Sequence, residues 1–161
     1  MRRAALAAVT VAAALAGCAG PTGAPVDRAP SQPSERFDAV VARVVDGDTV
    51  VLDPGGRARL IGVDTPEVHG GVECYGREAS AYATRRLTGR RVRIEVGADP
   101  RDRYGRLLVY LYADGRLFND DLVRAGYATT LAIAPNVDRA AQLSAAARRA
   151  RERELGLWSA C

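Results

Sequence analysis

Two acidic clusters each lie beside a short run of β-branched and apolar residues. Asp48 directly follows an Asp-Gly pair, and Asp64, Thr65 and Glu67 follow the run 58–63. Carboxylate and Thr oxygens at strand ends can converge on a hard cation such as Ca²⁺, which takes oxygen ligands only. Taken singly, each of these residues is more often a solvated turn residue, so only their convergence would make a site.

Two arginines lie close to these clusters in the sequence. Arg59 precedes Asp64 by five residues, and the two-residue repeat of a strand places residues at that spacing on opposite faces. A bend or bulge near Gly62 would bring them together, but the sequence shows none. Arg106 follows Tyr104 and a glycine at the start of a later apolar run. Either arginine alone is more often an ordinary surface residue.

The composition excludes several kinds of chemistry. All 23 basic residues are Arg, which rules out mechanisms that need a lysine amine, such as Schiff bases and the P-loop. One His and three Cys leave little for a zinc site. The 161 residues fit one ordinary domain, and a formal charge of +4 is only a hint of a polyanionic partner.

Hydrophobic periodicity predicts three strands, a helix, two strands and two helices. The expected strands are 39–45, 49–52, 58–63, 91–96 and 107–112, and the expected helices are 75–87, 119–124 and a last one from Asn136 or Asp138 to about 154. Strict alternation indicates that 91–96 is half-buried, and Asn119 is expected to cap its helix. Five strands with a helix after the third predict a mainly β fold, a five-stranded oligonucleotide/oligosaccharide-binding (OB) barrel with three helices.

The N-terminal segment has the features of a bacterial export signal. Residues 1–17 carry two arginines and then an apolar stretch too short to span a bilayer. They lead to Leu-Ala-Gly-Cys, which resembles a lipobox, so Cys18 is expected to be diacylated at the start of the mature chain. A plain secretory signal is the alternative, and both place the domain outside the cytoplasm. Residues 18–36 hold four of the eight prolines and predict an extended tether, with the folded domain at 37–161.

Five motifs in the same order and at compatible spacing resemble the staphylococcal nuclease (thermonuclease) family. They are VVDGDTVV at 44–51, RLIGVDTPE at 59–67, YGREAS at 75–80, DRYGR at 102–106 and YADGRLFNDDLVRAG at 112–126. The resemblance covers roughly residues 38–159. It implies an OB-fold barrel and a calcium-dependent phosphodiesterase that acts on DNA or RNA and leaves 3′-phosphate ends.

The resemblance also implies a role for each matching residue. The calcium ligands fall on Asp48, Asp64 and the backbone carbonyl of Thr65, the general base on Glu67, and the two phosphate-binding arginines on Arg59 and Arg106. These roles are chemically consistent, because a carboxylate can accept a proton from an attacking water and guanidiniums bind phosphate with two parallel hydrogen bonds. Nothing in this set is missing from the chain.

The nucleotide-binding residues match less well. Tyr104 corresponds to a family residue beside the nucleotide, although packing at the barrel rim would explain it equally. The family has two tyrosines before its Pro-Asn pair, whereas this chain has Ala132 and Ala134 in a segment one residue shorter. Since stacking contributes roughly 1–3 kcal/mol per base, we expect weaker nucleotide binding or altered base preference without loss of chemistry.

The remaining cysteines form an even pair. With Cys18 assigned to acylation, Cys74 and Cys161 are left in an oxidising compartment, which predicts a disulfide between them. Two unpaired thiols are the alternative.

These observations predict a monomeric, calcium-dependent, extracytoplasmic nuclease for DNA and RNA, anchored to the membrane through Cys18 or else secreted. The main alternative is a catalytically silent nucleic-acid-binding OB module. A surface adhesion or calcium-binding lipoprotein would explain the N-terminal signal but not the arginines.

Overall fold

A computed structural model of the chain describes residues 35–161. The predicted signal peptide, nearly all of the tether and Cys18 therefore lie outside the described residues. The described chain begins its first strand at Arg36, one residue before the expected start of the domain. Within this part of the chain, no helix is long and apolar enough to cross a membrane.

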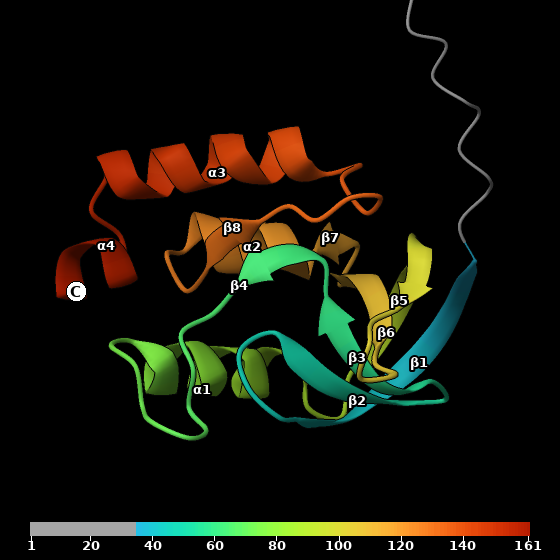
Figure 1. The fold of residues 1–161 in the computed structure, drawn as a ribbon. Helices are drawn as coiled ribbons and strands as arrows, with labels where there is room; N and C mark the ends of the chain where they lie inside the picture. The colour runs from blue at the N-terminus through green and yellow to red at the C-terminus, as the bar shows by residue number, and fades with distance from the viewer. Residues whose placement is uncertain (1–34) are drawn as a thin grey trace, which may run out of the picture.

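Five strands form the closed barrel that the sequence predicts (Figure 1). They are β1 (Arg36–Val44), β2 (Thr49–Asp53), β3 (Gly56–Leu60), β5 (Arg91–Arg101) and β6 (Leu107–Ala113). β1 pairs antiparallel with β2 and β5, β2 with β3, and β5 with β6. Parallel pairing of β3 with β6 closes the barrel, so the OB-fold prediction is confirmed.

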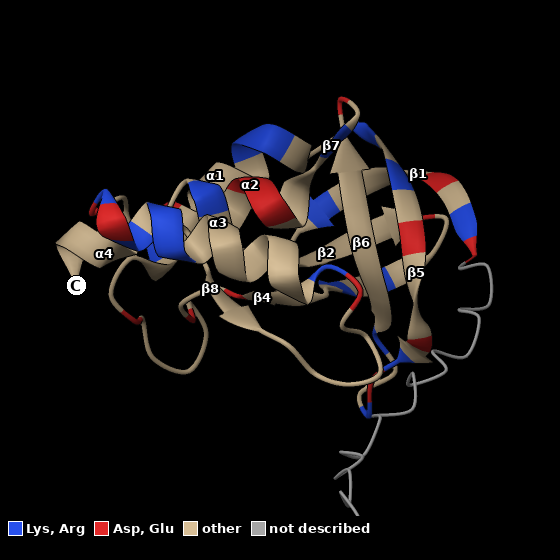
Figure 2. Ribbon diagram, turned by 90° about the horizontal axis from the view of Figure 1, so that it is seen from above, with Lys and Arg blue, Asp and Glu red and all other residues tan. Residues whose placement is uncertain are grey.

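The three expected helices lie together on one side of the barrel (Figures 1 and 2). They are α1 (Gly76–Leu87), α2 (Phe118–Arg124) and α3 (Ala140–Glu152). Three very short strands, β4 (Gly62–Asp64), β7 (Arg116–Leu117) and β8 (Thr129–Leu131), and a final turn of helix, α4 (Leu157–Ala160), complete the described fold.

One continuous apolar core joins the barrel to these helices. Val41, Ile94 and Leu111 from the strands are fully buried, as are Phe118 and Leu122 from α2. Removal of this much apolar surface from water is the main force that holds α2 against the barrel. The core therefore fixes α2 as a rigid support behind the strands.

The alternation predicted for β5 breaks at Glu95. This residue is buried instead of facing solvent, and its carboxylate forms ion pairs with Arg36 at 3.1 Å and Arg139 at 3.3 Å. A buried carboxylate is tolerated where cations and hydrogen-bond donors compensate for the lost water. The partners lie on β1 and just before α3, so sequence periodicity within β5 could not reveal them.

Two helix-start predictions were wrong. Asn119 is not a cap: α2 begins at Phe118, and the fully buried Asn119 side chain bonds to other elements. Asn136 and Asp138 both precede the true start of α3 at Ala140. The Asn136 amide instead bonds the backbone N–H and C=O of Asp99, each at 2.9 Å.

A sharp bend separates β3 from β4. Gly62 has φ of 78°, a left-handed conformation that glycine adopts without steric cost. A β-carbon at this position would also lie 2.5 Å from Cδ1 of Leu143 on α3, so the Leu143 side chain would have to move. This bend turns the chain from the barrel towards β8, with which β4 pairs.

Candidate active site

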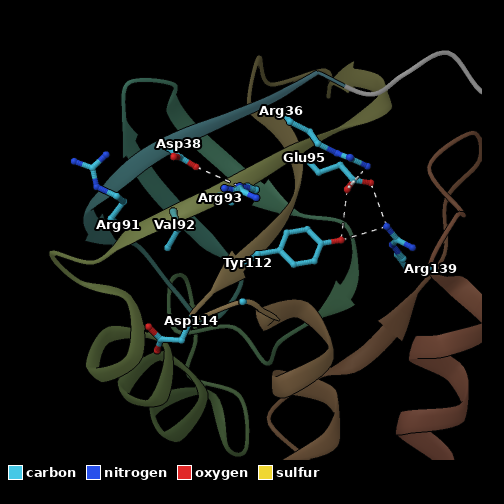
Figure 3. A pocket seen from close by; sticks show the side chains of 10 residues that line it. Arg36, Asp38, Arg91, Val92, Arg93, Glu95, Tyr112, Asp114 and Arg139 are labelled. Atoms are coloured by element: carbon cyan, nitrogen blue, oxygen red, sulfur yellow. Dashed lines mark hydrogen bonds and ion pairs between the residues drawn. The ribbon is translucent and has the colours of Figure 1, made fainter.

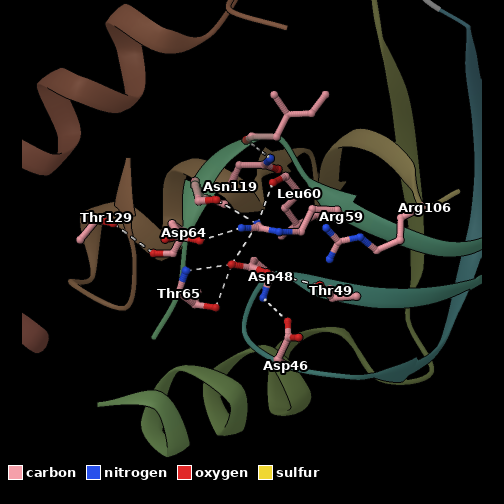
Figure 4. Close-up of polar contacts among 12 residues, drawn as sticks. Asp46, Asp48, Thr49, Arg59, Leu60, Asp64, Thr65, Arg106, Asn119 and Thr129 are labelled. Atoms are coloured by element: carbon pink, nitrogen blue, oxygen red, sulfur yellow. Dashed lines mark hydrogen bonds and ion pairs between the residues drawn. The ribbon is translucent and has the colours of Figure 1, made fainter. Parts of the chain in front are cut away.

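The carboxylate of Asp48 is the centre of the polar cluster at this bend (Figure 4). Asp48 lies in the turn between β1 and β2 and is only 5% exposed. Its Oδ2 accepts hydrogen bonds from the Thr65 N–H at 2.8 Å and the Thr65 hydroxyl at 2.9 Å. These bonds join the end of β4 to the start of β2, so two of the predicted calcium-binding residues lie side by side.

Burial strongly affects the charge of this carboxylate. Desolvation raises the pKa of Asp48 to about 7, although the nearby Arg59 charge and the Thr65 N–H oppose the change. A buried carboxylate of this kind is stabilised by any cation that binds to it. Asp46 lies in the same turn, accepts the Asp48 N–H at 3.1 Å and adds negative charge.

Arg59 links the two acidic clusters. Its guanidinium lies 2.9 Å from Oδ2 of Asp48 and 2.8 Å from Oδ1 of Asp64. It also donates to the carbonyls of Leu60 at 3.1 Å and Val63 at 2.9 Å. Arg59 and Asp64 therefore meet despite their five-residue spacing, because the bend at Gly62 changes the face on which Asp64 lies.

Asn119, on α2, stabilises this bend through hydrogen bonds of its side chain. Its side-chain amide donates to the carbonyl of Ile61 at 2.9 Å, and its side-chain oxygen accepts the N–H of Leu111 at 3.1 Å. Ile61 is the one residue between β3 and β4, where the strand ladder is interrupted. Sequence reasoning missed this role because Asn at the start of a short helix resembles a local cap.

Gly47 allows the Asp48 turn to approach β4. A β-carbon on Gly47 would lie 2.7 to 2.8 Å from three atoms of the Thr65 side chain. The glycine of the Asp-Gly-Asp sequence is therefore needed for a tertiary contact as well as for the hairpin turn. Sequence reasoning also missed Asp46, whose only signal was its two-residue spacing from Asp48.

Glu67 lies two residues beyond Thr65 but does not join the cluster through its carboxylate. Its side chain is exposed, and no hydrogen bond or ion pair within residues 35–161 joins that carboxylate to Asp48, Asp64 or Arg59. Its backbone is fixed by Glu73: the Glu67 N–H donates to Oε2 of Glu73 at 3.0 Å, and the Glu67 carbonyl accepts the Glu73 N–H at 2.9 Å.

Arg106 comes from the turn that leads into β6 and points towards the cluster in Figure 4. Asp102 orients it by accepting its Nε–H at 2.7 Å and its backbone N–H at 3.0 Å. The Tyr104 ring is 68% exposed, and the Arg106 guanidinium lies 5.5 Å from its centroid. Tyr104 is therefore not a packed residue of the barrel core, and the guanidiniums of Arg103, at 4.7 Å, and Arg106 both contact its ring.

A pocket of about 390 Å³ places both arginines beside this tyrosine. Besides Arg59, Tyr104 and Arg106, its wall includes Leu131, Ile133 and Ala134. Ala134 thus lines the pocket, whereas Ala132 is not among its lining residues. The segment in which the family has tyrosines presents aliphatic side chains to the arginines.

A larger pocket of about 570 Å³ lies elsewhere, on the outer face of β1, β5 and β6 (Figure 3). Glu95, Arg36, Arg139 and Tyr112 converge there, with the Tyr112 hydroxyl 3.2 Å from Arg139. These charges mostly neutralise one another in a structural network, so the smaller pocket between Arg59 and Arg106 is the better candidate for a reactive site.

The residues of the cluster fit a calcium ion. Among residues 35–161, no group of three or more His, Cys, Asp or Glu side chains is arranged around a common point. The predicted ligand set does not need one, because it combines two carboxylates with the backbone carbonyl of Thr65. Asp48 and Asp64 both contact the guanidinium of Arg59, so both carboxylates lie beside one cationic group. Every donor is an oxygen, as Ca²⁺ requires.

Known proteins with similar sequences show which family the chain belongs to. The family described as staphylococcal nuclease homologue matches residues 57–160. The chain belongs to the staphylococcal nuclease family. It is 38% identical to the thermonuclease of Staphylococcus intermedius over 125 residues, which cover 74% of each chain. It is also 32% identical over 133 residues to the SPbeta prophage-derived endonuclease YokF of Bacillus subtilis, covering 78% of this chain and 45% of that protein.

Proposed function

We propose that this member of the staphylococcal nuclease family is a calcium-dependent endonuclease that hydrolyses DNA and RNA and leaves 3′-phosphate ends. The nuclease relatives and the family match support the nuclease activity. The observation that carries the proposal is the cluster in which one guanidinium joins Asp48 to Asp64 beside a pocket that also contains Arg106.

The proposed chemistry uses the side chains in distinct roles. Asp48, Asp64 and the Thr65 carbonyl would hold Ca²⁺, which when bound supplies positive charge to a non-bridging phosphate oxygen. Glu67 accepts a proton from the attacking water, and that water forms a new bond to phosphorus. The bond from phosphorus to the 5′ oxygen breaks, and the 5′ oxygen takes up a proton. Arg59 and Arg106 stabilise the negative charge that grows on the phosphate during this step.

The two carboxylates beside the pocket support an enzyme over a module that binds nucleic acid without cleaving it. A module that only binds nucleic acid needs exposed cations and aromatic faces. Binding alone does not require a buried carboxylate, which is costly to desolvate, joined through the same guanidinium to a second carboxylate at a bend.

A cleavage assay with a matched substitution tests the proposed reaction. We expect wild-type protein to cleave single-stranded DNA and RNA with Ca²⁺ and to stop when EGTA removes it. Glu67→Gln should lower kcat by roughly a hundredfold or more, because general-base catalysis typically contributes 10²–10⁴-fold. The products should carry 3′-phosphates, detected by mass spectrometry.

Glu78→Ala is the control for this assay, since Glu78 is an exposed carboxylate on α1 with no role in the proposed reaction. Wild-type protein that binds DNA but shows no calcium-stimulated cleavage would contradict the enzyme and favour the silent module.

We also propose that the chain is exported and anchored through a diacylated Cys18. The support is the sequence alone: an arginine pair, a short apolar stretch and a Leu-Ala-Gly-Cys junction. Two acyl chains would hold the domain firmly, at about 0.8 kcal/mol per buried methylene. Expression of the full chain in bacteria with labelled palmitate should label the wild type and not Cys18→Ser. An unlabelled wild type released into the medium would instead support plain secretion.

The aliphatic pocket wall predicts where an aromatic residue would improve substrate binding. Ala134→Tyr should lower KM for a single-stranded oligonucleotide by at least about fivefold, since stacking contributes roughly 1–3 kcal/mol per base. Ala132→Tyr is the matched control, because Ala132 does not line the pocket. Equal effects of the two substitutions, or an unchanged KM for Ala134→Tyr, would contradict the proposed position of the nucleotide.

A further inference from the structure

We propose that Glu73 is a positioning residue for the carboxylate of Glu67, and that the Cys74–Cys161 disulfide keeps Glu73 in place. The proposal rests on the proposed role of Glu67 as the proton acceptor. The predicted catalytic residues do not by themselves hold Glu67 in position. Residues outside the cluster around Asp48 must do so.

The first observation is that Glu73 binds both backbone polar groups of Glu67. Its carboxylate Oε2 accepts the Glu67 N–H at 3.0 Å, and its own backbone N–H donates to the Glu67 carbonyl at 2.9 Å. The intervening residues 68–72 form a loop closed by these two bonds. Fixing both peptide groups of Glu67 fixes the direction in which its side chain leaves the backbone.

The start of α1 packs closely against the same backbone. A β-carbon on Gly76 would lie 2.6 Å from the Glu67 carbonyl oxygen and 3.0 Å from that of Pro66. The Gly76 N–H donates to the Glu73 carbonyl at 3.0 Å. Glu67 is therefore held between the Glu73 side chain and the first residue of a helix.

The disulfide connects this arrangement to the rest of the domain. Cys74 directly follows Glu73 and is bonded to Cys161, the residue after α4, 87 positions along the chain. α4 is itself fixed, because the Leu157 N–H donates to the Gly126 carbonyl at 2.8 Å. The disulfide thus connects the residue after Glu73 to the residue after α4, in addition to the contact of the loop residue His69, whose Nε2 lies 3.2 Å from the Val45 carbonyl.

The arrangement also lies against the proposed calcium site. Asp64, Thr65 and Glu73 line one pocket of about 300 Å³ together with both cysteines. Glu67 and Glu73 are exposed, and hydrogen bonds at exposed positions add little to global stability. Their effect should instead appear in catalysis, where a displacement of about 1 Å can cost roughly a hundredfold in rate.

The first test compares Glu73→Ala with Glu73→Gln. Alanine removes the acceptor for the Glu67 N–H, and we expect kcat to fall at least about tenfold with KM and the half-maximal Ca²⁺ concentration within about twofold. Glutamine keeps a carbonyl oxygen that can accept this bond, so it should restore most of kcat. Glu78→Ala is the matched control, and far-UV circular dichroism and Tm check that each variant is folded.

A double substitution separates positioning from a general structural effect. If Glu73 acts through Glu67, adding Glu73→Ala to Glu67→Gln should cause no further loss of kcat. Wild-type kcat in Glu73→Ala, failure of glutamine to restore it, or an equal loss in both backgrounds would overturn the proposal. If Glu67→Gln is itself fully active, the proposed proton acceptor is wrong, and the two failures are thereby distinguished.

A peptide map and a second double-substitution experiment test the presence and the role of the disulfide. A non-reduced tryptic digest should contain peptides 60–77 and 154–161 linked to each other. At temperatures well below its Tm, the variant with both Cys74→Ser and Cys161→Ser should have a lower kcat than the wild type. Adding Glu73→Ala to this variant should lower kcat no further than Glu73→Ala alone does. Unlinked peptides, or wild-type kcat in the serine variant, would overturn the role of the disulfide.

Discussion

The buried carboxylate of Asp48 is the constraint on which the rest of this site depends. It is withdrawn from water at the turn between β1 and β2, and burial raises its pKa to about 7. The fold compensates with donors from a distant segment, the N–H and hydroxyl of Thr65, and with the charge of Arg59. Each compensating group is also a proposed functional residue. The need to stabilise one carboxylate therefore brings the proposed metal ligands and a phosphate-binding arginine to one place.

The bend between β3 and β4 makes this compensation possible. A straight strand would separate Arg59 from Asp64, whereas the left-handed Gly62 turns β4 so that Asp64 joins Asp48 on the Arg59 guanidinium. Asn119 satisfies the Ile61 carbonyl that the interrupted ladder leaves free. The buried α2 supplies this amide, so the core of the domain supports the site directly. The closed barrel thus acts as a rigid base for an irregular segment.

Sequence patterns predicted the barrel well because its strands alternate and its turns carry Asp-Gly pairs. Long-range partners could not be predicted in that way. Asn119 resembled a helix cap, since local sequence cannot reveal its bonds to Ile61, between β3 and β4, and to Leu111 on β6. The Arg59–Asp64 contact needed a positive φ at Gly62, which one glycine among 16 does not reveal. Glu73 gave no signal, because its hydrogen bonds to Glu67 exist only once the loop has closed.

If the bend at Gly62 assembles the proposed calcium and phosphate sites, the Gly62→Ala substitution should disrupt both. The control is Gly115→Ala, since Gly115 has a similar φ of 75° but no atom within 4 Å of an added β-carbon. Calcium-stimulated cleavage would be measured for both variants, with far-UV circular dichroism to check the barrel. We expect folded Gly62→Ala to lose at least about tenfold in kcat/KM and Gly115→Ala to retain wild-type cleavage. Wild-type cleavage by Gly62→Ala would contradict it.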